Sequence, residues 1–454
     1  MKGAIWRRRL TFVLVVVLLT WAAAGPTAAQ AKIFEPETFT LDNGLQVVVI
    51  TNRRAPIVTH MLWYKVGAAD EPAGRSGIAH FLEHLMFKGT EALGPGEFSQ
   101  IIARNGGREN AFTSYDYTGY YQTVASDRLE IVMKHEADRM TNLKLTDELV
   151  LPEREVVLEE RRSGVDREPS SQLSEALRAA LFLNHPYRLP VIGWEDEIHA
   201  LTKDDAVTFY RRWYAPNNAV LIVAGDVSTD EVRRLAETYY GPIPAREIPL
   251  RQRPQEPPQL AARRVVLENP RVRQPSITIR YLAPSYNAGQ SEHAYALQVL
   301  DQILGGGPTS RLYRALVVDQ AVAAGAGSGY GASSLDLSIF SVYASPRPGV
   351  EIEQVEAAVR KEIARIVDDG VTEDEVAIAK KRLQAEAVYA RDQLGAGPRI
   401  LGTALVTGQT VEDIENWPER IEAVSLEQVN AAAKAVLASD KRSATGLLLP
   451  EPTS

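Results

Sequence analysis

The chain has 454 residues, of which 45% are hydrophobic and 24% charged, and its formal net charge is −8. This length predicts two or three domains, and the acidic balance argues against binding to nucleic acid or to an anionic membrane surface. Because the sequence contains no cysteine, disulfides are excluded and a metal site would have to use His, Asp or Glu ligands.

The N-terminus has the pattern of a secretory signal peptide. Residues 1–9 are basic, residues 10–24 are apolar, and Ala-Gln-Ala at 29–31 fits a small-residue cleavage site. The apolar stretch is short for a spanning helix, and an uncleaved anchor is the alternative. Removal of residues 1–31 takes away four basic residues and no acidic one, which leaves 46 basic against 58 acidic residues and a net charge of −12. We therefore expect a periplasmic protein without stable membrane insertion.

The next hundred residues alternate between strand and helix patterns. The segment FTLDNGLQVVVI predicts a β-hairpin, because Asp-Asn-Gly is typical of a turn and LQVVVI of a strand. A second strand is expected in MLWYKVGA, a helix in GEFSQIIARNGG, and two strands in the alternating run NAFTSYDYTGYYQTVA. Asp127 is expected to cap a helix that ends near Leu143, another helix starts near Asp147, and AVLIVAG reads as a buried strand.

The run SGIAHFLEHLMFKGT lies between the expected strand MLWYKVGA and the expected helix GEFSQIIARNGG. It has no proline and few β-branched residues, so we expect a short helix from Gly77 to Phe87. Ser76 is a plausible N-cap and Gly89 a natural stop. Because apolar residues occupy nearly every face, the helix should be buried.

This helix carries two of the seven histidines of the chain. His80, Glu83 and His84 are three and four residues apart, so they should project from one side. Buried without partners they would cost several kcal/mol, whereas two neutral imidazoles at i and i+4 can bind one Zn²⁺. H-x-x-E-H is also the inverted-zincin signature. The alternative interpretation is a pair of satisfied core histidines.

A catalytic zinc site needs a third protein ligand. In the helical run EREVVLEERR, Val156 and Val157 form the predicted apolar stripe, and Glu153 and Glu160 lie on that same stripe, two turns apart. Glu159 should point elsewhere and pair with arginine. The alternative is a solvated acidic helix.

The sequence then divides and repeats. The proline-rich stretch within residues 241–262 predicts an extended linker. Beyond it, VLDQILGGG resembles FLEHLMFKG, and VTEDEVAIAKKRLQAEA resembles LTDELVLPEREVVLEER, which indicates two copies of one unit. Gln298 and Gln302 replace the histidines in the second copy. We therefore predict a catalytic domain at 32–240 and a homologous inactive domain at 263–454.

HFLEHLMFKGT, GGRENAFTSYDYTGYY, EREVVLEE and YAPNNAVLIVAGDV together resemble the pitrilysin-type inverted-zincin metallopeptidases, in the bacterial and mitochondrial-processing-peptidase-like branch. The resemblance covers essentially the whole mature chain. It implies an α+β fold of two homologous α/β-sandwich domains, each an antiparallel-rich sheet covered by helices, arranged as a clamshell. It implies one Zn²⁺ per chain held by His80, His84 and Glu160, with Glu83 as general base and Glu153 as a helper carboxylate.

The resemblance also implies a substrate and a binding mode. Members of the family hydrolyse extended peptides, which they bind as an added strand beside the histidine-bearing helix. In this chain that edge would run from Asn110 to Tyr115, and the expected substrate-binding residues are Asn110, Ala111, Phe112 and Thr113. The rival hypothesis is a non-catalytic peptide-binding or scaffold protein of the same fold.

One departure from the family pattern concerns partners. Members that act alone present an arginine, and seven residues later a tyrosine, from the second half. Val317 and Ala324 stand at those positions here, and we expect Arg311 and Tyr313 to be packing or surface residues. We therefore expect a heterodimer with a paralogous non-zinc subunit that supplies the Arg/Tyr clamp; a homodimer is the alternative.

Overall fold

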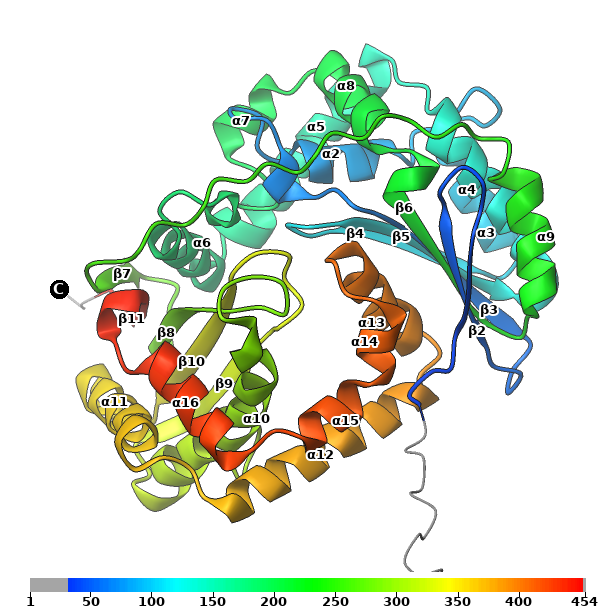
Figure 1. Ribbon diagram of the computed structural model, residues 1–454. Helices are drawn as coiled ribbons and strands as arrows, with labels where there is room; N and C mark the ends of the chain where they lie inside the picture. The colour runs from blue at the N-terminus through cyan, green and yellow to red at the C-terminus, as the bar shows by residue number, and fades with distance from the viewer. Residues whose placement is uncertain (1–31, 452–454) are drawn as a thin grey trace, which may run out of the picture. The chain divides into compact units, whose positions relative to one another are not determined.

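The computed structural model describes residues 32–451, so the predicted signal segment 1–31 lies outside the described residues (Figure 1). From Phe34 onward the chain forms one unit in which two mixed sheets are each covered by helices. Among the described helices, none combines the length and apolarity that crossing a bilayer requires. The predicted fold class of two α/β units is confirmed.

The first sheet has six strands in the order β1-β2-β6-β3-β5-β4. Its strands are β1 (Glu37–Thr40), β2 (Gln46–Thr51), β3 (Ile57–Tyr64), β4 (Arg108–Thr113), β5 (Thr118–Ala125) and β6 (Ala219–Gly225). The β2–β6 pair is parallel and the other pairs are antiparallel. The predicted β1–β2 hairpin is confirmed, and β4 lies at the edge.

Strand β3 begins earlier than the sequence predicted. The prediction began at Met61, whereas the strand starts at Ile57 and includes the fully buried His60. Polar partners make this burial tolerable, because the two His60 ring nitrogens lie 2.9 Å from Gln122 Oε1 and 3.0 Å from Tyr240 OH. A polar residue in mid-strand hides the strand from a reading based on apolar runs.

Helices of the first half cover one face of this sheet (Figure 1). They are α2 (Ile78–Leu85), α3 (Glu97–Arg104), α4 (Leu129–Asn142), α5 (Asp147–Arg161), α7 (Glu195–Ala200), α8 (Lys203–Trp213) and α9 (Thr229–Tyr239). Helix α6 (Pro169–Leu181) instead packs on the second sheet, where Leu177 and Leu181 lie in one apolar cluster with Ala444. The predicted cap of α4 is wrong, because Asp127 lies inside a 3₁₀ turn (Ser126–Arg128) that precedes the helix.

The second sheet repeats the first. Its strands are β7 (Arg263–Asn269), β8 (Ser276–Ala283), β9 (Ala323–Tyr330), β10 (Ser338–Pro346) and β11 (Ser443–Pro450). Their order is β7-β11-β8-β10-β9, with a parallel β7–β11 pair and antiparallel neighbours otherwise. This is the arrangement β2-β6-β3-β5-β4 taken in the same chain order. The internal repeat predicted from two short sequence matches is therefore confirmed.

Most helices of the second half pack in its own core, whereas α13 packs on the first sheet. The elements α10 (Ala294–Gly305), α11 (Ile352–Asp369), α12 (Glu373–Asp392), α16 (Leu426–Leu437) and a π-helical turn (Tyr313–Asp319) belong to the second half's core. The remaining helices, α13 (Ala396–Val406), α14 (Val411–Glu415) and α15 (Trp417–Glu422), follow α12. Helix α13 packs on the first sheet, where a Cβ at Gly402 would lie 2.1 Å from the Trp63 ring.

The segment from Gly241 to Ala262 contains no helix or strand, as predicted for the linker. It runs between α9 and β7 as the green trace in Figure 1, and it is firmly anchored. The Arg253 side chain is 6% exposed and bonds to Asp70 at 2.9 Å, Asp116 at 2.5 Å and Asp336 at 2.8 Å. A buried arginine between three carboxylates makes this linker a strap across both halves.

Candidate metal centre

Helix α2 begins at an unusual N-terminus. Its N-cap is Gly77, with φ of 88°, and Ser76 does not cap the helix as predicted, since the Ser76 hydroxyl accepts from the Trp194 amide at 2.9 Å. The buried carboxylate of Glu71 instead accepts from the amides of Gly77 and Ala79, each at 2.9 Å. Burial raises the pKa of Glu71 well above its usual value. The Glu71 side chain, which lies in the segment just before α2, therefore fixes the start of the helix.

One turn further, α2 presents two histidines toward α5. His80 Nε2 lies 3.7 Å and His84 Nε2 lies 3.3 Å from Glu160 Oε2, and one ligand atom from each residue falls within 4.8 Å of the others. In a tetrahedral zinc site, bonds of about 2.0–2.1 Å put neighbouring ligand atoms roughly 3.3 Å apart. Two imidazoles and a carboxylate at these separations fit a zinc ion with one position left open.

Glu160 reaches this point because of its phase on α5. The neighbouring Glu159 points away and pairs with Arg167 at 3.0 Å, as expected. The predicted stripe needs correction, because Val157 is fully buried whereas Val156 is 50% exposed. The buried face of α5 instead combines Val157 with Glu153 and other residues, so the helix is turned slightly from the predicted orientation.

Glu153 supports one of the histidines. Its Oε1 lies 3.0 Å from His84 Nδ1, and its Oε2 forms an ion pair with Lys88 in the loop after α2. Burial alone would raise the pKa of Glu153, but the hydrogen bonds from His84 and Lys88 outweigh it and lower the pKa. The carboxylate is thus charged and fixes the orientation of the His84 ring.

The pKa values of the two histidines are shifted in opposite directions. Burial, followed by the nearness of His84, lowers the pKa of His80 to about 4. Burial also acts to lower the pKa of His84, but hydrogen bonds to Glu153 and Glu160 outweigh it and raise this pKa to about 9. The hydrogen bond from His84 lowers the pKa of Glu160. A proton on this pair of histidines is therefore held by His84, between the Glu153 and Glu160 carboxylates.

Glu83 lies on α2 one residue before His84, and it faces the edge strand. Thr113 Oγ1 donates to Glu83 Oε2 at 2.6 Å, which ties the end of β4 to this carboxylate. Glu83 is only 9% exposed, and burial raises its pKa although the Thr113 hydrogen bond opposes the rise. A buried carboxylate with a raised pKa beside an open position is suited to accept and release a proton.

The predicted substrate edge is a free edge in this structure. Strand β4 pairs with β5 on one side only, so within residues 32–451 its outer main-chain groups have no strand partner. Ala111, Phe112 and Thr113 are half-buried along it, and the Asn110 side chain accepts from the Ala111 amide at 2.9 Å. The strand ends at Thr113, so Tyr115 lies beyond it and packs on Tyr187.

The residues at the clamp positions have apolar side chains. Val317 is 8% exposed within the core of the second half, and Ala324 is exposed on β9. Arg311 is held by Glu375, with Nε and Nη2 each 2.7 Å from a carboxylate oxygen, and it also donates to the Gly370 carbonyl. Arg311 is thus a packing residue, as the sequence analysis expected.

Sequence reasoning missed Glu71 and Lys88. Glu71 precedes the helix by several residues, and no local pattern connects it to the Gly77 amide. Lys88 offered a signal, because it is a lone cation directly after an apolar helix, where it can meet a carboxylate on α5.

Comparison with known proteins agrees with this geometry. Residues 46–194 match the family model described as Insulinase (Peptidase family M16), and residues 200–383 match that of the Peptidase M16 inactive domain. The chain is 34% identical over 365 residues to zinc protease PqqE of Helicobacter pylori, covering 80% of each chain. It is 33% identical over 420 residues to an uncharacterized zinc protease of Mycobacterium leprae, covering 90% of this chain and 91% of the other.

A solved structure of a protease from Helicobacter pylori superposes with a TM-score of 0.86 at 29% identity, covering 93% of this chain and 100% of the other. The resemblance drawn from the motifs is confirmed, and the chain belongs to peptidase family M16.

Proposed function

We propose that this protein is a zinc-dependent endopeptidase that hydrolyses extended or unfolded peptides. The observation that carries the proposal is the contact between Thr113 and Glu83, at 2.6 Å. It joins a free strand edge, where a peptide can add, to a buried carboxylate beside the His80, His84 and Glu160 cluster. Binding edge, proton acceptor and metal ligands therefore meet at one point.

In this proposal His80, His84 and Glu160 hold one Zn²⁺, and Glu153 orients His84. Zinc bound there supplies Lewis-acid chemistry, which makes a water molecule more acidic and polarises the peptide carbonyl. Glu83 takes the proton of the attacking water and delivers it to the leaving amine nitrogen. Its raised pKa brings both proton transfers closer to balance.

The β4 edge supports the choice of substrate. An added peptide strand would exchange main-chain hydrogen bonds with the outer groups of β4, from Asn110 to Thr113. Such pairing requires an extended backbone and reads little of the side chains. It favours unfolded segments over folded proteins.

We further propose that the chain works with a second subunit. Val317 and Ala324 cannot donate side-chain hydrogen bonds, so the inactive half has no arginine–tyrosine pair at these positions. A paralogous non-zinc subunit would supply that clamp; a homodimer is the alternative assembly. We also propose a periplasmic location after cleavage of residues 1–31, and domains at 32–240 and 263–454 joined by a linker at 241–262.

The catalytic proposal is tested with quenched peptides. The purified chain is stripped with a chelator, dialysed, and assayed before and after addition of one equivalent of zinc, with Glu83→Gln as the matched variant. We expect turnover to depend on zinc and to vanish in the variant. Zinc binding without any turnover, alone or with partners, would instead favour a peptide-binding scaffold.

The subunit proposal needs a separate assay. The zinc-loaded chain is tested with and without a candidate paralogue that carries the Arg and Tyr residues. We expect activity to rise strongly on mixing, together with a heterodimer in sedimentation. Full activity of the isolated chain, unchanged on mixing, would exclude the two-chain arrangement.

A further inference from the structure

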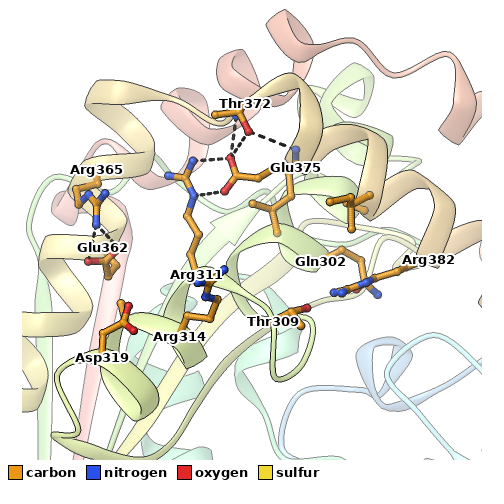
Figure 2. A pocket seen from close by; sticks show the side chains of 14 residues that line it. Gln302, Thr309, Arg311, Arg314, Asp319, Glu362, Arg365, Thr372, Glu375 and Arg382 are labelled. Atoms are coloured by element: carbon orange, nitrogen blue, oxygen red, sulfur yellow. Dashed lines mark hydrogen bonds and ion pairs between the residues drawn. The ribbon is translucent and has the colours of Figure 1, made fainter.

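A cavity lies in the second half of the chain, between α10, α11, α12 and the π-helical turn (Figure 2). Its volume is about 640 Å³. Ligand sites for small molecules commonly measure about 300–1,000 Å³. Four arginines line it together with three acids, Asp319, Glu362 and Glu375.

Two of these arginines are already neutralised. Arg311 makes two 2.7 Å bonds to Glu375, and Arg365 Nη1 lies 3.2 Å from Glu362. Thr372 adds a third partner for Glu375 through a capping box at the start of α12. Figure 2 shows the Arg365–Glu362 pair and the Arg311–Glu375–Thr372 group as two separate sets of contacts.

The other two, Arg314 and Arg382, have no ion-pair partner within 4.0 Å in the part of the chain that the structure describes. They come from different elements, the π-helical turn and α12, and both line the same cavity. Arg314 is exposed and Arg382 is half-buried, and the lining also holds one carboxylate, Asp319, that makes no ion pair among the described residues. Guanidinium groups bind carboxylate and phosphate oxygens through paired N–H donors.

The cavity adjoins Gln302, which stands where His84 stands in the first half. In the first half, the space lined by Phe87, Phe98 and Arg139 near the end of α2 measures about 10 Å³.

We propose that this cavity binds a small anion, with a carboxylate or phosphate held by Arg314 and Arg382. The lining also includes Ile303, Ile378 and Ala379, so a short apolar chain attached to the anionic group would be accommodated. This site is separate from the metal centre and does not depend on the catalytic proposal.

The test uses two probes that share an apolar chain, hexyl phosphate and heptanoate, with hexanol as the neutral comparison. Binding to the purified chain is measured by calorimetry, and protection is measured as a shift in melting temperature. We expect one or both anions to bind and to stabilise the protein, and hexanol to do neither. Phosphate-only or carboxylate-only binding identifies the source of the oxyanion.

Matched variants locate the site. Arg314→Gln and Arg382→Gln should each weaken anion binding about tenfold, because each removes a charge-assisted contact. Lys381→Gln removes the same charge from the neighbouring position on α12, outside the cavity lining, and should leave binding unchanged. An equal loss in the Lys381 variant, or no preference of the native chain for either anion over hexanol, overturns the proposal.

Discussion

Helices α2 and α10 occupy the same place in the two halves, yet among the described residues only α2 of the two carries candidate metal ligands. Around α10 much of the framework persists. Asp301 stands where Glu83 stands, and it accepts from Ser328 Oγ at 2.5 Å and from the Tyr330 amide at 3.2 Å on the edge strand β9. Glu386 matches Glu160 in the repeat. A carboxylate on the helix, tied to an edge strand, is thus a property of the fold.

The difference lies in two nitrogen donors. Gln302 Nε2 donates to Glu386 at 3.1 Å, in place of the imidazole that faces Glu160 in the first half. Gln298 is engaged by Tyr286 OH at 2.6 Å and by Trp417 Nε1 at 3.1 Å. Amide oxygens are poor zinc ligands beside imidazole, so the second copy keeps the geometry and loses the metal chemistry. The same fold thus carries different side chains at the candidate ligand positions.

The largest effect should come from the base that the second half has shortened to aspartate. Glu83→Gln removes a proton acceptor but leaves the two histidines and Glu160 in place. General-base catalysis contributes roughly 10²–10⁴-fold, so peptide hydrolysis should fall by at least that range while zinc content stays at one per chain. Retention of substantial turnover on a peptide that the native chain cleaves would refute the assignment.

The next effect concerns the ligand that both halves retain. Glu160→Gln should weaken zinc binding more than about 100-fold, because loss of a charged ligand exceeds the usual cost of an outer-shell change. Glu159→Gln, one residue away and paired with Arg167, is the matched control and should bind zinc normally. Sensitivity at Glu159 instead would mean that a different face of α5 meets the metal.

A smaller effect is expected from Lys88, whose target Glu153 is replaced by Ala379 in the second copy. Lys88→Met leaves Glu153 without its cation, so the carboxylate should orient His84 less firmly and zinc affinity should drop about tenfold. Competition with a chromophoric chelator measures this. Lys134→Met, an exposed change of the same kind on α4, provides the baseline.

The smallest effect should follow from a change at Asp301, the counterpart of Glu83 in the second half. Asp301→Asn replaces one of the two carboxylate oxygens that accept from Ser328 Oγ and the Tyr330 amide with an NH₂ group, and it should cost about 1 kcal/mol in the free energy of unfolding. Peptide hydrolysis should not change, because Asp301 lies near no metal ligand set. Loss of activity at unchanged stability would show that the second half takes part in the chemistry directly.

Much of the candidate site was accessible from the sequence because it depends on spacing within single helices. The separation of His80 and His84 follows from helical geometry, whereas Glu160 was selected by its helical phase together with the family resemblance. The strand edge at Asn110 followed from the family resemblance. The other contacts of the site depend on how the chain folds back on itself. Glu71 reaches the start of α2 and Lys88 reaches Glu153 on α5. No local periodicity encodes them.

The fold shows the same division. Strands with apolar runs were predicted well, whereas β3 was shortened because His60 interrupts its pattern. Val156 was placed on the buried stripe although it is half-exposed, since two adjacent valines cannot be ranked without knowing what α5 packs against. The arginine-lined cavity was not predicted at all, because it depends on which side chains fail to fill a space.

The packing of α13 on the first sheet has a consequence for dissecting the protein. The face it covers includes Val48, Met61, Trp63 and Ile222, all nearly or fully buried. A fragment cut at the linker would keep the whole His80–His84–Glu160 set but would expose this apolar face to water. Such a fragment should aggregate, because α13 of the second half would no longer shield this apolar face of the first half from water.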